Sequence, residues 1–250
     1  MNEHLFKYLL RLGDSSLILS QRLAEWCGHG PMLEEDIAMT NISLDLIGQA
    51  RALLTYAGEV EGKGRTEDDL AYHRGEREYF NLLIAEQPNG DFARTMMKQF
   101  LISAFQHCLY DALRSSKDKT IAALAEKSVK EIAYHLRHSG EWVKRLGSGT
   151  EESAMRTKNA LGELWLYTGD MFDADETDNE MLKAGIGADL KALQGRWEKI
   201  VDEVFEAASL EIPKDVFMIK GSRSARHTEH LGHLLSEMQI LQRTIPDATW

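Results

Sequence analysis

Carboxylates and histidines that recur along long helices are the residues of this sequence that could bind a pair of metal ions. The chain contains 40 acidic residues and 9 histidines. A dinuclear iron site in a helical bundle takes a Glu from each of two helices and a Glu-x-x-His pair from each of the other two, because residues three apart share a helix face. The sequence contains no Glu-x-x-His. Its nearest approaches are Glu131-x-x-x-His135 and Glu229-x-x-x-His233.

Helix phase distinguishes these two pairs. In the expected last helix, steps of about 100° per residue place a polar trio opposite the apolar stripe, on a solvated or partner-facing side. This trio is Glu229, His233 and Glu237. Glu131, His135 and His138 instead lie beside the apolar face of their helix. Glu131 is therefore the best ligand candidate, although a histidine held there by hydrogen bonds is the commoner outcome.

The positions that could complete a site with Glu131 are poor metal ligands. Across the turn of an antiparallel hairpin, Ser103 mirrors Glu131, and serine is a weak iron ligand beside a carboxylate. The middle of a second helix offers Leu46 and Gln49, and the first helix offers Asp14. One glutamate and one aspartate without a convergent histidine cannot hold two irons. We therefore expect no metal, no cofactor and no catalytic residue in this chain.

Helical periodicity runs through the whole chain, and no alternating strand pattern interrupts it. We expect helices at about 5–27, 34–61, 77–86, 91–116, 118–147, 151–168, 188–209 and 224–243, with an acidic turn at 173–178. Asp91 and Asp118 are expected N-caps of two of them. The first two helices, and the fourth and fifth, should each form an antiparallel hairpin, so the sequence predicts an all-α four-helix bundle with flanking helices in a single domain, residues 1–250.

Composition narrows the class of partner and the compartment. The formal net charge of −11 argues against nucleic acid and against an anionic membrane surface. The two cysteines form no CxxC pair and fit a reducing compartment. No run approaches the roughly 18–20 apolar residues that a membrane span requires. We expect a soluble, cytoplasmic protein.

Six stretches, in order along nearly the whole chain, carry a specific resemblance. They are Leu10–Pro31, Asn41–Arg51, Glu86–Ala93, Lys130–Ser139, Met171–Glu176 and His227–Gly232. The sequence resembles the structural, non-catalytic subunits of the bacterial phenylacetyl-CoA 1,2-epoxidases, which are multicomponent oxygenases of phenylacetate degradation. The resemblance implies a ferritin-like fold and a catalytic sister subunit of the same fold that carries the di-iron centre. It also implies dioxygen as oxidant and a separate reductase as electron donor.

The resemblance extends to the ligand positions. The catalytic sister has an Asp-Glu-Ala-Gly-His run on its second helix, and the matching run here is Asp45 to Gln49, with Leu46 and Gln49 in the ligand positions. The second Glu-x-x-His becomes Glu131-Ile-Ala-Tyr134. Leu46, Gln49, Ser103, Glu131 and Tyr134 would then mark the level of a lost site. The resemblance implies a scaffold that binds the catalytic sister.

Two other functions stay open, together with the place of the interface. A di-metal oxidase in its own right would use Asp14, Glu131, His135 and His138. A self-assembling helical protein would need no other subunit. We expect contacts with the catalytic sister, or with a second copy of this chain, at Trp142 or at the polar trio of the last helix. If Glu131 is buried, a nearby histidine, arginine or lysine should hold it, and His135 and His138 are the local candidates.

Overall fold

The computed structural model describes residues 2–245, and helices are the regular structure of that part of the chain. The α-helices are α1 Asn2–Ala24, α2 Leu33–Glu61, α3 Glu67–Tyr72, α4 Phe92–Leu113, α5 Lys119–Gly147, α6 Glu151–Trp165, α7 Glu176–Ala184, α8 Leu190–Ala207, α9 Glu229–Met238 and α10 Ile240–Thr244. Three short 3-10 helices are η1 Glu76–Glu78, η2 Thr168–Phe172 and η3 Ser222–Ser224. These elements form two compact units.

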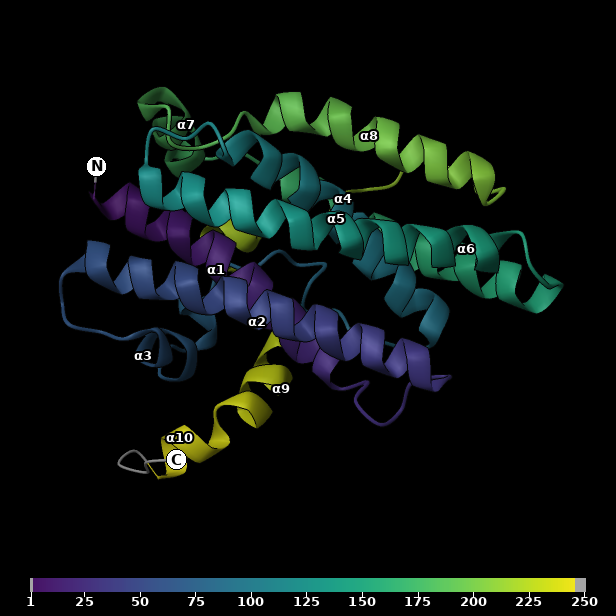
Figure 1. The fold of residues 1–250 in the computed structure, drawn as a ribbon, viewed down its shortest axis with the longest axis horizontal. Helices are drawn as coiled ribbons and strands as arrows, with labels where there is room; N and C mark the ends of the chain where they lie inside the picture. Colours follow the sequence, from purple (N-terminus) through teal and green to yellow (C-terminus); the bar gives the residue numbers. More distant parts are fainter. Residues whose placement is uncertain (1, 246–250) are drawn as a thin grey trace. The chain divides into compact units, whose positions relative to one another are not determined.

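The first unit comprises the described residues up to Pro88 together with those from Gly221 onward, and its centre is the α1–α2 hairpin. The two helices run side by side (Figure 1). Ser20 on α1 and Ser43 on α2 join them reciprocally: each hydroxyl donates to the other residue's carbonyl oxygen at 2.9 Å. Gly13 lets the helices approach closely, because an added Cβ would lie 2.9 Å from the Leu54 side chain. The predicted first hairpin is confirmed.

Two expected elements of this unit are wrong. The 77–86 helix is absent; η1 and turns occupy that range, and the preceding helix is α3, whose Thr66 and Asp69 form a capping box. The expected 224–243 helix begins later, because Ala225 has a left-handed φ of 51°. It is also divided into α9 and α10 at Gln239. Short capped segments carry too few turns for a periodic signal, so the sequence pattern does not resolve them.

The second unit, Asn89–Lys220, is built on the α4–α5 hairpin. Both expected N-caps are confirmed: Asp91 accepts from the Arg94 amide at 2.9 Å, and Asp118 accepts from the Ile121 amide at 3.0 Å. Helix α8 packs on α4, where the indole nitrogen of Trp197 donates to the Leu101 carbonyl at 3.0 Å. The expected acidic turn at 173–178 is in part a helix start, because Asp175 caps α7.

The all-helical fold class is confirmed, and two long hairpins are the elements that a ferritin-like bundle requires. That the chain is a single domain stays a prediction. Within residues 2–245, no helix combines the length and the apolar character needed to cross a membrane.

Candidate functional site

Asp14, one proposed ligand of a di-metal site, is fully buried in the middle of α1. Arg74, just beyond α3, donates to both of its carboxylate oxygens, with Nη1 to Oδ2 at 3.0 Å and Nη2 to Oδ1. The backbone amide of Phe80 donates to Oδ2 at 2.9 Å. Three donors therefore converge on this carboxylate, and two of them belong to a cation.

The environment of Arg74 favours the charged form of its guanidinium. Burial by itself would lower the pKa of the guanidinium, but the adjacent Asp14 carboxylate outweighs burial and raises it above its usual value. Arg74 also donates to the carbonyl oxygens of Leu70 and Glu78. The guanidinium thus links α1 to the segment between α3 and η1. A metal ion at Asp14 would have to compete with a cation that is already buried.

The α2 positions of the predicted lost site hold no metal donor of iron's preferred type. Leu46 and Gln49 are buried, as the sequence predicts, and Asp45 is half-buried. A leucine side chain has no donor atom, and an amide oxygen is a weaker ligand for iron than a carboxylate or an imidazole. Leu46 and Gln49 therefore do not supply the carboxylate and imidazole ligands that a di-iron centre needs.

The second unit holds the other predicted positions. Ser103 is fully buried on α4, and its hydroxyl accepts a hydrogen bond from the side-chain amide of Gln99 at 2.9 Å. Glu131 on α5 is half-buried, and its carboxylate lies 3.6 Å from the Lys127 ammonium. A lysine, Lys127, thus pairs with Glu131, whereas the local candidates expected from the sequence are His135 and His138.

The neighbours of Glu131 on α5 point in different directions. His135 is fully buried and His138 is half-buried, while Tyr134 is exposed. The Tyr134 ring packs against His138, with centroids 5.8 Å apart, and lies under the Arg137 guanidinium at the same distance. Among residues 2–245, no group of three or more histidine, cysteine, aspartate or glutamate side chains converges to hold a metal ion.

The two predicted interface regions differ in how much of their side chains is exposed. Trp142 on α5 is half-buried, and its ring meets the Phe92 ring edge-on, with centroids 5.0 Å apart. On α9, the polar trio Glu229, His233 and Glu237 is exposed, opposite the buried Leu231, Leu234 and Leu235. That helix phase is as predicted. Contact of either region with another protein chain stays a prediction.

Sequence reasoning missed a second buried carboxylate, Glu86. It is fully buried and accepts a hydrogen bond from the side-chain amide of Asn81 at 2.8 Å. It also accepts from the backbone amide of Thr228 at 2.7 Å and from the Thr228 hydroxyl at 2.8 Å. His227 Nδ1 lies 2.8 Å from the same carboxylate. Burial opposes protonation of His227, but the Glu86 hydrogen bond outweighs it and raises the histidine pKa. Within the first unit, Glu86 thereby fastens the residues at the start of α9 to the segment that follows η1.

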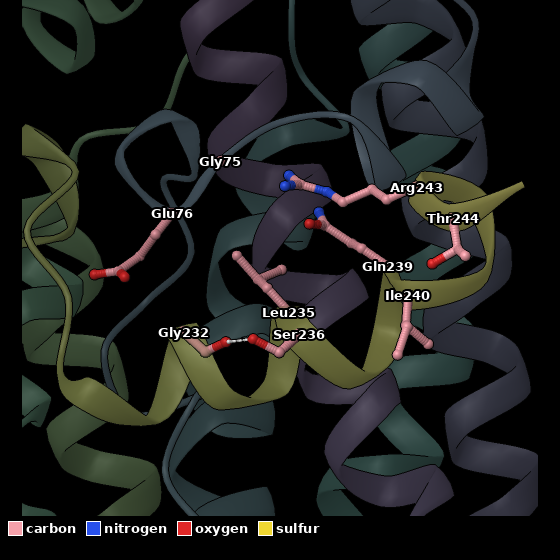
Figure 2. A pocket seen from close by; sticks show the side chains of 9 residues that line it. All are labelled: Gly75, Glu76, Gly232, Leu235, Ser236, Gln239, Ile240, Arg243 and Thr244. Atoms are coloured by element: carbon pink, nitrogen blue, oxygen red, sulfur yellow. Dashed lines mark hydrogen bonds between the residues drawn. The ribbon is translucent and has the colours of Figure 1, made fainter. Parts of the chain in front are cut away.

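A pocket of about 490 Å³ lies between α9, α10 and the Gly75–Glu76 turn (Figure 2). Its most polar lining groups already serve the fold. Gln239 donates to the carbonyl oxygens of Ala71 and Arg74 at 3.0 Å each. Arg243 donates to the Arg74 carbonyl at 2.9 Å, so this wall continues the structure around Asp14. The pocket brings no cluster of catalytic side chains together.

Two comparisons with known proteins found similar sequences. The model of the family described as "Phenylacetic acid catabolic protein" matches residues 1–250. A relative from Escherichia coli (strain K12), a subunit of 1,2-phenylacetyl-CoA epoxidase, is 47% identical over 250 residues, which cover 100% of both chains. The chain therefore belongs to the phenylacetic acid catabolic protein family.

Proposed function

We propose that this chain is a non-catalytic scaffold within a phenylacetyl-CoA 1,2-epoxidase. In this role it binds the di-iron catalytic subunit and stabilises its active form during aerobic phenylacetate degradation in the cytoplasm. Membership of the family and the full-length similarity to a component of such an epoxidase support a place in the complex. The catalytic subunit would hold the iron and the substrate, and a reductase would supply electrons to it.

The burial of Asp14 against Arg74 is the observation that carries the non-catalytic part of the proposal. A ligand of a di-iron centre must offer its carboxylate to the metal, and this carboxylate is occupied by a guanidinium and a backbone amide. Removing Arg74 would leave a buried charge, which is costly. Asp14 thus acts as one half of a structural ion pair.

The other candidate positions support the same conclusion. Leu46 has no donor atom, and Glu131 pairs with Lys127. The di-metal oxidase alternative needs Asp14 together with Glu131, His135 and His138. The Asp14 carboxylate, however, is already paired with the Arg74 guanidinium. No observation in the described residues favours that alternative over the scaffold.

Metal analysis and reconstitution test the proposal. The chain, purified alone from iron-rich medium, should contain far less than one iron, manganese or zinc ion per molecule. The catalytic subunit should lose most of its phenylacetyl-CoA-dependent oxygen consumption when this chain is withheld and regain it when the chain is added back. Close to two metal ions per chain, or full turnover by the catalytic subunit alone, would contradict the scaffold role.

A further inference from the structure

The residues that follow α8 in the second unit present two apolar side chains to solvent. From Val216 to Ile219 the exposure alternates: Val216 and Met218 are half-buried, whereas Phe217 is 86% and Ile219 36% exposed. These residues belong to no helix, and a period of two is that of an extended chain. We call residues 216–219 the edge segment.

Contacts with α6 and η2 hold the edge segment in place. The Met218 side chain packs against η2. The Ile219 backbone amide donates to the Leu166 carbonyl oxygen, at the end of α6, at 2.8 Å. Directly after the segment, the Lys220 ammonium lies 2.7 Å from the Asp173 carboxylate. The segment is therefore already ordered, which reduces the entropy that a partner would lose on binding to it.

The backbone of the edge segment offers hydrogen-bonding groups that the protein does not use. In an extended chain, the N–H and C=O of one residue point to one side and those of the next residue point to the other. Since the Ile219 amide points to α6, the backbone groups of Val216 and Met218 point away from it. Among the residues that the structure describes, those groups accept and donate no hydrogen bond. A row of such groups is the feature with which another strand pairs.

A positively charged pocket precedes the edge segment in the chain. Its volume is about 390 Å³, and it lies between α6 and residues 211–214, with Leu161 and Ile212 among its apolar lining. Its charged lining residues are Lys158, Lys214 and Glu211. Both ammonium groups are without an ion pair in the described part of the chain. Two cations against one carboxylate favour an acidic partner.

Charge also argues against a second copy of this chain as the occupant. Antiparallel pairing of two edge segments centred on Phe217 would set Lys214 of each copy opposite Lys220 of the other, because both lysines are three positions from Phe217. Parallel pairing would bring each lysine near its own counterpart. Either arrangement places like charges together, which opposes association. A different chain that carries carboxylates avoids this repulsion.

We propose that the edge segment binds an extended, acidic stretch of a different protein chain. The stretch adds as a strand along Val216 and Met218, covers Phe217 with an apolar side chain, and places a carboxylate at Lys158 and Lys214. In strand addition, backbone hydrogen bonds supply affinity and the side chains supply selectivity. A contact this short is small for a specific interface, so we expect a dissociation constant on the order of 10 μM. This inference does not depend on the proposed function.

Photo-crosslinking of the complete chain, in cells that assemble it with its natural partners, is the first test. The reactive analogue p-benzoylphenylalanine in place of Phe217 should give one discrete adduct with a different protein. The same analogue in place of Met155, which is 56% exposed on α6, is the matched control and should not give it. Mass spectrometry should locate the cross-link in an apolar stretch with an aspartate or glutamate within about four residues, the reach from Phe217 to Lys214 in an extended chain.

A synthetic peptide of the cross-linked stretch is the second test, and it probes the geometry. Phe217→Ser and Lys214→Glu should each raise the dissociation constant of the peptide at least about ten-fold in fluorescence anisotropy, whereas Met155→Ser should leave it unchanged. N-methylation of every second peptide amide should abolish binding in one register and leave it intact in the other. The reason is that only alternate residues of a strand pair with a given edge.

Four results would overturn the proposal. They are an adduct at Phe217 no stronger than at Met155, an adduct with a second copy of this chain, a cross-linked stretch without acidic residues, and equal effects of the two N-methylation registers. Phe217 and Lys214 are exposed, so their variants should fold, and thermal unfolding checks this. If either variant unfolds, the N-methylated peptides still decide the question on the wild-type chain.

Discussion

Replacement of Arg74 tests the central structural argument, that Asp14 is held as one half of a buried ion pair. In Arg74→Met, the side chain keeps much of its apolar bulk while the cation is lost. Asp14 is fully buried. In the variant its carboxylate would still accept from the Phe80 backbone amide, but it would have lost the guanidinium that serves as its counter-ion. Breaking a buried pair from one side costs about 3–5 kcal/mol. We expect a loss of that size, a large fraction of the roughly 5–15 kcal/mol that stabilises a typical domain.

Urea unfolding at neutral pH, followed by circular dichroism, measures this loss. Arg156→Met is the matched control, because Arg156 also pairs with two carboxylates, Asp91 and Glu152, but its side chain is half exposed. An exposed pair contributes about 0–1 kcal/mol, so this control should change little. Adding Asp14→Asn to Arg74→Met should recover part of the loss, because it removes the uncompensated charge.

Two results would refute the reasoning. If Arg74→Met cost no more than Arg156→Met, the Asp14 carboxylate would not depend on the guanidinium, and its availability as a ligand would have to be reconsidered. If the losses of unfolding free energy caused by Asp14→Asn and by Arg74→Met simply added in the double variant, the two residues would not be coupled. Metal analysis of Arg74→Met completes the test: the freed carboxylate should still bind no stoichiometric metal, because Leu46 supplies no second donor.

The remaining predictions concern the other buried carboxylate, α5 and the surface. The pKa of His227 is raised in the folded state. Its contribution to the free energy of unfolding should therefore be complete below about pH 6.5 and should fade as the pH rises through the folded-state pKa. The difference in unfolding free energy between wild type and His227→Gln should accordingly shrink from about pH 6 to about pH 9. Glu131→Gln should change stability by less than about 1 kcal/mol, since its pair with Lys127 is partly exposed, and the assembled complex should keep its turnover. Trp142→Ala and Glu237→Lys, tested separately by co-purification with the catalytic subunit, should show which predicted interface region is used; an intact complex in both cases would exclude both regions.

Local signals in the sequence are sufficient for the long helices. Asp91 and Asp118 each stand one residue before an apolar periodic segment, and both cap the helix that follows. The burial of Leu46 and the exposure of the α9 trio also follow from helix phase, because a 3.6-residue period fixes which side chains share a face. Prediction from the residues therefore extends to elements of several turns and to the faces that they present.

The interactions that define the interior of the first unit were not predictable in this way. Asp14 and Arg74 are 60 residues apart, and Glu86 and His227 are 141 apart. Arg74 and Glu86 lie in short turns, where no period indicates which side chain points inward. Identifying such pairs from the residues requires knowing which segments meet, and that follows from tertiary packing.

The two buried carboxylates bind groups in the same stretch of chain. Asp14 receives Arg74 and the Phe80 amide, whereas Glu86 receives Asn81 and the α9 start, so the chain between residues 74 and 86 is fixed at both ends by an acid. Gln239 then ties α10 to the Arg74 carbonyl. Since each buried charge would be costly alone, the segments that neutralise them are held in place together. The carboxylate on α1 at the level of the expected site thereby stabilises the folded C-terminal helices.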